Sequence, residues 1–237
     1  MRLDKYLSKA TGLSRKEIKR AIMQRNVSVN GECVRDAGFH VEESDNIEFF
    51  DSEIEAPRPR YLMMHKPEGT VCSNDDKTHP TVMGLLFDEA RPDDLHTVGR
   101  LDVDTTGLLL ITDDGQWSHR ITAPKHKMAK RYFVVTERPL EASLVDIFKE
   151  GVQLHGEKNL TKPAKLEILS DHEAHLTLTE GKYHQVKRMF AAVDNHVLEL
   201  HRDKIGDVTL DESLEPGDYR ELTEDECRLL GVEIEND

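Results

Sequence analysis

A loop rich in glycine, aspartate and threonine is the stretch of the sequence best suited to carry chemistry. It reads G-R-L-D-V-D-T-T-G at residues 99–107 and leads directly into the strand-like run Leu108–Thr112. Three roles are open to Asp102 and Asp104: a nucleophile, one half of an acid/base pair, or a ligand for a hard metal ion. A structural role is equally open, since Asp and Thr side chains often cap the amides of such turns.

Several other patterns that carry chemistry are missing from the sequence. The three cysteines have no C-x-x-C spacing, the twelve histidines form no H-E-x-x-H motif, and no G-x-S-x-G, G-x-G-x-x-G or P-loop motif occurs. Zinc sites, disulfide frameworks, serine hydrolases and the common nucleotide-binding folds are therefore disfavoured. A metal-dependent hydrolase built on Asp102 and Asp104 is an alternative, although no motif supplies further ligands. We expect no metal and no cofactor.

The segments that must position this loop have mixed character. Strand-like patterns cover residues 61–64, 108–112, 132–136, 164–169 and 174–179. Apolar residues at helical spacing occur at 144–148 and 186–193. Strands and helices do not alternate regularly, so the order indicates the α+β class. Trp117 fits the core of such a domain better than a base-stacking surface.

Charge is distributed unevenly along the chain. The 46 Asp and Glu residues exceed the 32 Lys and Arg residues, a formal net charge of -14 that would argue against nucleic-acid binding. Residues 1–35, however, hold nine Lys and Arg against three acids, a net charge of +6, whereas residues 207–237 carry -10. The basic N-terminal segment is therefore able to bind a polyanion despite the acidic total.

The basic segment is predicted to fold as a small unit. Apolar residues at helical spacing predict a first helix, and Ser14 with Glu17 forms a capping-box pattern before a second. The pair Asn30-Gly31 between valine-rich runs predicts a tight β-hairpin, and a further strand pair is expected around Val41 and residues 47–49.

Domain limits follow from the prolines. Residues 56–60 read A-P-R-P-R, an extended linker in which proline blocks both helix and strand pairing. We therefore expect one domain at residues 1–55 and a second at residues 61–237.

The N-terminal pattern of two short helices followed by V-x-V-N-G resembles the S4-like RNA-binding domain of the αL type. The resemblance implies that the exposed basic face of the second helix contacts RNA phosphates, which Lys and Arg neutralise without reading bases. An ordinary solvated basic face is the alternative. The residues implied in RNA binding here are Arg2, Arg15, Lys16, Lys19 and Arg20.

The second domain resembles the pseudouridine synthases that modify ribosomal RNA. The likeness rests on GRLDVDTTGLLLITDDG at 99–115, HKPEG at 65–69, KRYFV at 130–134, EGKYHQVKRMF at 180–190 and LHRDKIG at 200–206. It is greatest to the branch that acts on 16S rRNA. The resemblance implies a catalytic domain with a mixed, mainly antiparallel sheet flanked by helices.

The matching motifs imply roles for individual residues. Asp102 matches the catalytic aspartate, which forms a covalent adduct with a flipped-out uridine. Tyr132 matches an active-site tyrosine that stacks on uracil and helps to remove the C5 proton. Lys187 matches the basic partner of the aspartate, with Arg188 as the adjacent alternative. Further contacts to RNA are expected from Arg100, Lys130, Arg188 and Arg202, beside a basic cluster that includes Lys125 and Lys127.

The resemblance as a whole implies a cofactor-free isomerase that converts a uridine of 16S rRNA to pseudouridine. Two alternatives are the same reaction on 23S rRNA and a non-catalytic S4-type RNA-binding factor of ribosome assembly. The expected partner is ribosomal RNA, free or within an assembling small-subunit particle. No run approaches the roughly 18 apolar residues of a membrane span, and no signal peptide is recognisable, so we expect a cytoplasmic protein without membrane contact. The lack of heptads favours a monomer.

Overall fold

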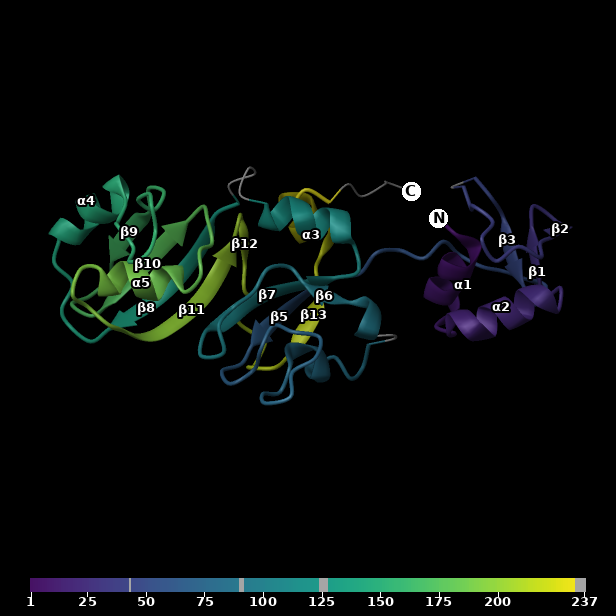
Figure 1. Cartoon of the computed structure of the whole chain (residues 1–237), viewed down its shortest axis with the longest axis horizontal. Coiled ribbons are helices and arrows are strands. Elements are labelled where there is room, and N and C mark those ends of the chain that lie inside the picture. The colour runs from purple at the N-terminus through teal and green to yellow at the C-terminus, as the bar shows by residue number, and fades with distance from the viewer. Residues whose placement is uncertain (43, 90–91, 124–127, 233–237) are drawn as a thin grey trace. The chain divides into compact units, whose positions relative to one another are not determined.

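The computed structural model describes residues 1–42, 44–89, 92–123 and 128–232. Its contacts divide the chain into two compact units, Met1–Pro59 and Arg60–Asp237, both of which are drawn in Figure 1. Lys125 and Lys127 lie outside the described residues. Within the described residues, no helix has both the length and the apolar character needed to cross a membrane.

The N-terminal unit packs two helices against a small sheet. Its sheet has the strand order β2-β1-β3-β4. The elements are α1 (Leu3–Thr11), α2 (Arg15–Met23), β1 (Val27–Val29), β2 (Glu32–Cys33), β3 (Ile47–Phe49) and β4 (Ser52–Glu53). Apolar residues of both helices and of β1 and β3 form its buried core.

Local sequence signals account for most of this unit. The predicted capping box is confirmed, because Ser14 and Glu17 each accept a hydrogen bond from the other's backbone amide. The predicted hairpin turn is confirmed as well, with Asn30 and Gly31 at φ +52° and +80° between β1 and β2. The prediction of a strand around Val41 is wrong. The amide of Val41 donates to the Met1 carbonyl, and β3 pairs instead with β1 and β4.

The second unit is built around one large sheet. Its strand order is β13-β5-β7-β11-β8-β10-β9, with β6 on β7 and β12 on β11. The strands are β5 (Tyr61–Lys66), β6 (His96–Thr97), β7 (Thr106–Thr112), β8 (Lys130–Thr136), β9 (Lys165–Ile168), β10 (Glu173–Leu178), β11 (Val197–Ile205), β12 (Val208–Thr209) and β13 (Tyr219–Glu221). The helices are α3 (Gly115–Thr122), α4 (Ser143–Glu150), α5 (Gln185–Ala191) and α6 (Glu224–Leu229), with short 3-10 turns at Val82–Leu85 and Pro92–Asp94. The described strands pair antiparallel apart from β7 with β11, so the sheet is mixed and mainly antiparallel, as predicted.

The sheet has two halves with separate cores, and β11 joins them (Figure 1). One core lies between α4, α5 and strands β8 to β10, where Phe148 packs edge-on against Phe190. A second surrounds Trp117 of α3, which is fully buried and donates its indole N–H to the Leu230 carbonyl at 3.0 Å. The expectation that Trp117 belongs to the core is therefore confirmed. A third lies on the opposite face of β5 and β7, where Leu62 and Leu109 are fully buried.

The two halves meet at a very close approach of β7 and β11. Gly107 pairs with Arg202 and has φ +106°, and a Cβ on this residue would lie 2.2 Å from the Arg202 carbonyl oxygen. The Arg202 guanidinium crosses the same junction, because its Nε donates to the Leu108 carbonyl at 2.8 Å. Glycine at position 107 is thus a condition for the geometry of the junction.

Candidate active site

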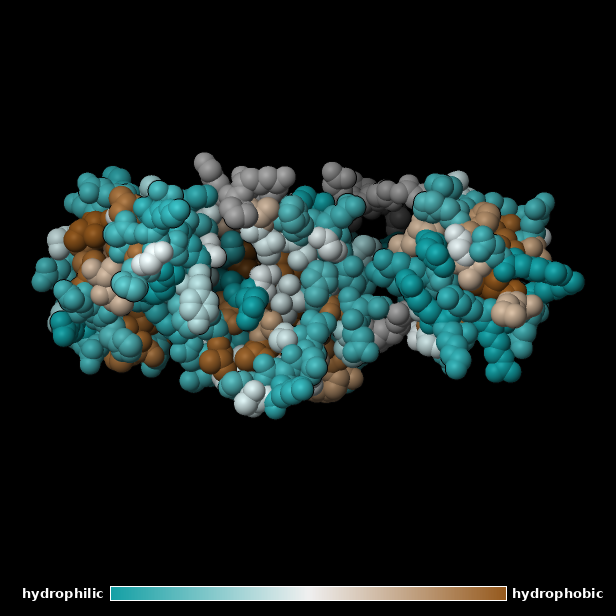
Figure 2. Space-filling model, in the orientation of Figure 1, coloured by the Kyte–Doolittle hydropathy of each residue, from teal (hydrophilic) through white to brown (hydrophobic). Residues whose placement is uncertain are grey.

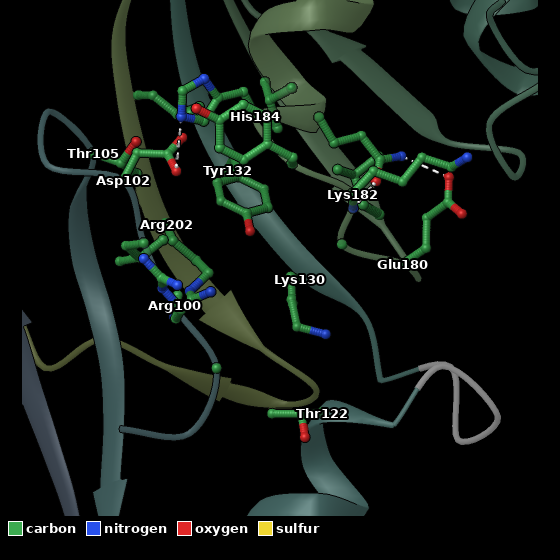
Figure 3. Close-up of a pocket in the computed structure, with 18 of the residues that line it drawn as sticks. Arg100, Asp102, Thr105, Thr122, Lys130, Tyr132, Glu180, Lys182, His184 and Arg202 are labelled. Atoms are coloured by element: carbon green, nitrogen blue, oxygen red, sulfur yellow. Dashed lines mark hydrogen bonds and ion pairs between the residues drawn. The ribbon is translucent and has the colours of Figure 1, made fainter. Parts of the chain in front are cut away.

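A cavity of about 450 Å³ opens where the two halves of the sheet meet. The loop that contains Asp102 forms one wall, and β8, β11 and the segment that leads into α5 form the others (Figure 3). Segments that lie far apart in the sequence therefore contribute to one site.

A buried lysine holds the loop that carries Asp102 through hydrogen bonds to the backbone carbonyls of that loop. Lys66, at the end of β5, is fully buried, and its ammonium donates to the carbonyls of Thr105 at 2.8 Å, Pro67 at 3.0 Å and Val103 at 3.4 Å. Burial lowers the pKa of Lys66, an effect that nearby acidic groups oppose. The sequence showed HKPEG as a motif but gave Lys66 no role. The contacts indicate that it positions the loop.

Lys187, one turn into α5, lies between two carboxylates. Its Nζ is 4.0 Å from Asp102 Oδ2 and 2.5 Å from Asp104 Oδ1. Burial raises the pKa of Asp104, but the hydrogen bond and charge of Lys187 outweigh burial, so the net shift is downward. Because each partner is at least a quarter exposed, these are screened interactions.

Arg188, the alternative partner, turns away from Asp102. Its guanidinium bonds to Glu157 at 3.2 Å and to the carbonyls of His155 and Tyr183, both at 2.9 Å. The structure therefore places Lys187 beside Asp102, and Arg188 in contacts that tie α5 to the segment between α4 and β9.

His184 is a site residue that the sequence reasoning missed. Its Nε2 is 3.5 Å from Asp102 Oδ1 (Figure 3). Its ring stacks on that of Tyr183, with the ring centroids 3.8 Å apart. His184 has φ +46°, a conformation that ends the loop and starts α5. The signal was its place beside Gln185 in a matched motif, but no spacing in the sequence shows that the ring turns toward Asp102.

Lys130, Tyr132 and Arg202 lie on one face of the sheet. Lys130 and Tyr132 are two residues apart on β8, and Arg202 of β11 is the direct cross-strand partner of Tyr132. Tyr132 is half-buried, whereas Arg202 is only 2% exposed. Arg202, predicted as an RNA contact, is thus a buried part of the cavity wall, whereas Arg100 is exposed at the cavity.

The basic residues predicted in the N-terminal unit fall into two groups. Arg15, Lys16, Lys19 and Arg20 are exposed on α2, opposite the buried Ile18, Ala21 and Ile22. Figure 2 shows hydrophilic side chains along the edge of the unit where α2 lies. Arg2 instead forms a two-pronged ion pair with the buried carboxylate of Asp4, at 3.0 and 3.1 Å. The residues of α2 therefore form the unit's free basic face.

Metal ligands do not converge in the described part of the chain. No group of three or more His, Cys, Asp or Glu side chains is arranged there to hold an ion. Asp102 and Asp104 instead share the single ammonium of Lys187.

Comparisons with known proteins identify the family of this chain. The model of the family described as RNA pseudouridylate synthase matches residues 60–192, and that of the S4 domain matches residues 1–47. The chain is 53% identical over 230 residues to ribosomal small subunit pseudouridine synthase A of Vibrio cholerae, covering 97% of this chain and 99% of the relative. It is 52% identical over 227 residues to the protein of the same name from Escherichia coli, covering 95% and 98%. A crystal structure of a pseudouridylate synthase matches with a TM-score of 0.70 and 52% identity, covering 97% and 99%. The chain belongs to the RNA pseudouridylate synthase family, whose members are isomerases, and it carries an S4 domain in its N-terminal unit.

Proposed function

We propose that this protein converts a uridine of 16S rRNA to pseudouridine, with Asp102 as the nucleophile. The observation that carries the proposal is the Asp102 carboxylate, held on a fixed loop between Lys187 and His184 and facing Tyr132 across a cavity of about 450 Å³. The relatives from Vibrio cholerae and Escherichia coli, which are named for the small ribosomal subunit, support the 16S target.

The reaction follows from the groups in the cavity. The target uridine leaves its stack and enters the cavity, at a cost of a few kcal/mol that contacts to the RNA offset. The Asp102 carboxylate attacks the nucleotide, at C1′ of the ribose or at C6 of the base, and the N1–C1′ bond breaks. The base turns within the cavity and C5 bonds to C1′. The bond between Asp102 and the nucleotide breaks, by displacement from C1′ as C5 attacks or by elimination from C6, and the free carboxylate is restored. C5 then loses its proton and N1 gains one, so the product is an isomer of the substrate.

Each neighbour of Asp102 has a distinct part in these steps. Lys187 and His184 orient the carboxylate, since both contact its oxygens. Tyr132 offers its ring as a stacking surface and its phenol as the group nearest the C5 proton. The cavity walls keep the detached base from diffusing away.

The N-terminal unit supplies affinity for the RNA. The exposed cations of α2 neutralise phosphates, so binding depends on salt and not on base sequence. The binding constant K falls as the salt concentration rises, so a plot of log K against log salt has a negative slope. Replacing Arg15, Lys16, Lys19 and Arg20 by Gln should reduce the magnitude of this slope by about 3. An unchanged slope would remove α2 from the RNA interface.

An Asp102→Asn variant tests the proposed chemistry. It should bind rRNA within about twofold of the wild type and form no pseudouridine, whereas Asp104→Asn, the matched control, should still form product. Each rRNA is assayed separately, with and without ribosomal proteins. Formation of pseudouridine by Asp102→Asn would show that Asp102 is not the nucleophile. Pseudouridine formed only in 23S rRNA would exclude 16S rRNA as the target. Loss of product in both the Asp102→Asn and Asp104→Asn variants, together with inhibition of the wild type by a chelator, would favour a metal site.

A further inference from the structure

Two buried polar side-chain atoms among the described residues have no hydrogen-bond partner. They are the Thr105 hydroxyl and Nη2 of Arg202, and both residues line the same cavity. An unpaired buried donor is costly, so such groups are retained where a ligand satisfies them. The Arg202 group is the more informative, because it also carries charge.

Arg202 and Lys130 form a cationic wall without an acidic partner among the described residues. Arg202 uses its Nε on the Leu108 carbonyl, and the Lys130 ammonium donates to the Met128 carbonyl at 3.1 Å. Burial and, to a lesser extent, the charge of Arg202 lower the pKa of Lys130 to about 8. Like charges of which one is buried and the other half-buried are expensive to hold together unless something anionic comes to lie against them.

The carboxylates that line the cavity are engaged elsewhere. Asp102 lies against His184 and Lys187. Glu180 accepts hydrogen bonds from the Lys162 amide at 2.9 Å and from the Gln185 side chain at 2.7 Å. Among the described residues that line the cavity, no carboxylate is left for the cationic wall, and a bound substrate is the natural source of a partner.

We infer that Arg202, assisted by Lys130, stabilises the negative charge that develops on the carbonyl oxygens of uracil during the reaction. The inference rests on the function proposed above. If Asp102 attacks C1′, the electron pair of the N1–C1′ bond stays on N1 and is shared with O2 and O4. If Asp102 adds to C6, the electron pair of the C5–C6 double bond moves to O4 as an enolate. Both routes place negative charge on a carbonyl oxygen of the ring. A hydrogen-bond donor that is already in position stabilises this charge strongly, because it need not reorganise during the reaction.

The position of Arg202 and Lys130 indicates that they contact the uracil base and not an RNA phosphate. Arg202 and Lys130 flank Tyr132, and Figure 3 shows the Tyr132 hydroxyl directed toward the space between them. A uracil stacked on the Tyr132 ring would have a polar edge toward the Arg202 guanidinium, whose Nη2 is buried and unpaired. Arg202 is 2% exposed, whereas Arg100 is exposed and better placed for a phosphate that stays at the cavity mouth.

The experiment compares full-length variants under single-turnover conditions with saturating enzyme. Arg202→Gln should lower the rate about 100-fold or more, and Lys130→Met about tenfold, with the Kd for rRNA and its salt slope unchanged. Lys204→Met, which removes a cation from the same strand outside the cavity wall, is the control and should keep the wild-type rate. A normal rate with a weaker, less salt-dependent Kd would identify a phosphate contact and overturn the inference.

A second arm tests the charge on the ring directly. In rRNA transcribed with 5-fluorouridine the fluorine stabilises the ring anion but leaves no C5 proton to lose, so after C5 bonds to C1′ water adds across the N1=C6 bond. This fluorinated, C5-linked nucleoside is measured after nuclease digestion, and the loss of rate caused by Arg202→Gln should be smaller with this RNA than with unmodified RNA. An equal deficit with both RNAs would overturn the inference. If Arg202→Gln fails to fold, Lys130→Met and Lys130→Arg carry the same test, and equal rates for the two would count against a charged wall. An inactive wild type would instead refute the proposed function.

Discussion

Gly107→Ala is a sharp test of how the two halves of the catalytic sheet are joined. A Cβ at position 107 would lie 2.2 Å from the Arg202 carbonyl oxygen and 2.8 Å from its nitrogen. Ordinary contacts require about 3.5 Å, so β7 and β11 would have to separate by about 1 Å. The backbone at φ +106° adds strain for any residue with a side chain. Strain and overpacking together should lower the free energy of unfolding by about 3 kcal/mol.

Urea-induced unfolding measures this loss, and a second glycine supplies the control. At Gly115, the first residue of α3, an added Cβ meets no atom within 4 Å, so Gly115→Ala should leave stability unchanged or raise it by up to about 1 kcal/mol. Activity gives a second readout. Movement of the Arg202 backbone by about 1 Å should reduce the single-turnover rate about 100-fold even in molecules that remain folded.

Two results would refute this reasoning. A Gly107→Ala protein that unfolds at the wild-type urea concentration would show that the strands separate at no cost. Reduced stability with a normal rate would show that the junction holds the fold but does not place Arg202 for chemistry.

Three further predictions concern the lysines around the cavity. Lys66→Met deprives the carbonyls beneath the Asp102 loop of their donor and should lower the free energy of unfolding by about 2 kcal/mol or more in urea titrations; an unchanged midpoint would contradict the contacts described for Lys66. Lys187→Met should lower the single-turnover rate about 100-fold, whereas Arg188→Met should stay within about threefold, and the reverse order would place the wrong cation beside Asp102. Because the pKa of Lys130 is lowered to about 8, its cation is present at pH 7 and is lost as the pH rises through 8. The wild-type rate should therefore decline between pH 7 and 9 more steeply than that of Lys130→Arg, and identical profiles would exclude the Lys130 charge from the rate.

Local features were predictable from the sequence because neighbouring residues determine them. The capping box at Ser14 and the turn at Asn30-Gly31 depend on residues a few positions apart, and both formed as expected. Trp117 was assigned correctly from its size and apolar surface. The strand expected around Val41 failed because the N-terminal residues, distant in sequence, compete for its backbone groups.

Only the site residues that match a family motif in the sequence could be predicted. The resemblance singled out Asp102 and Lys187 and left Arg188 open, and the choice between the two cations depends on the direction in which α5 presents its side chains. Lys66 and His184 went unassigned because their contacts with the Asp102 loop are tertiary. The parallel pairing of β7 with β11, which places Arg202 in the cavity wall, has no signal in local periodicity.

The position of β11 between β7 and β8 has a consequence for biosynthesis. Asp102 precedes β7 and Tyr132 lies on β8, but the two strands are joined only through β11, which is made later. A growing chain therefore cannot hold these two side chains in one sheet until it extends through residue 205. β13 must then close against β5, a contact between distant segments of the kind that slows folding. The proposed active site is consequently one of the last parts of the chain to form, and we expect no pseudouridine from a nascent chain that stops short of β11.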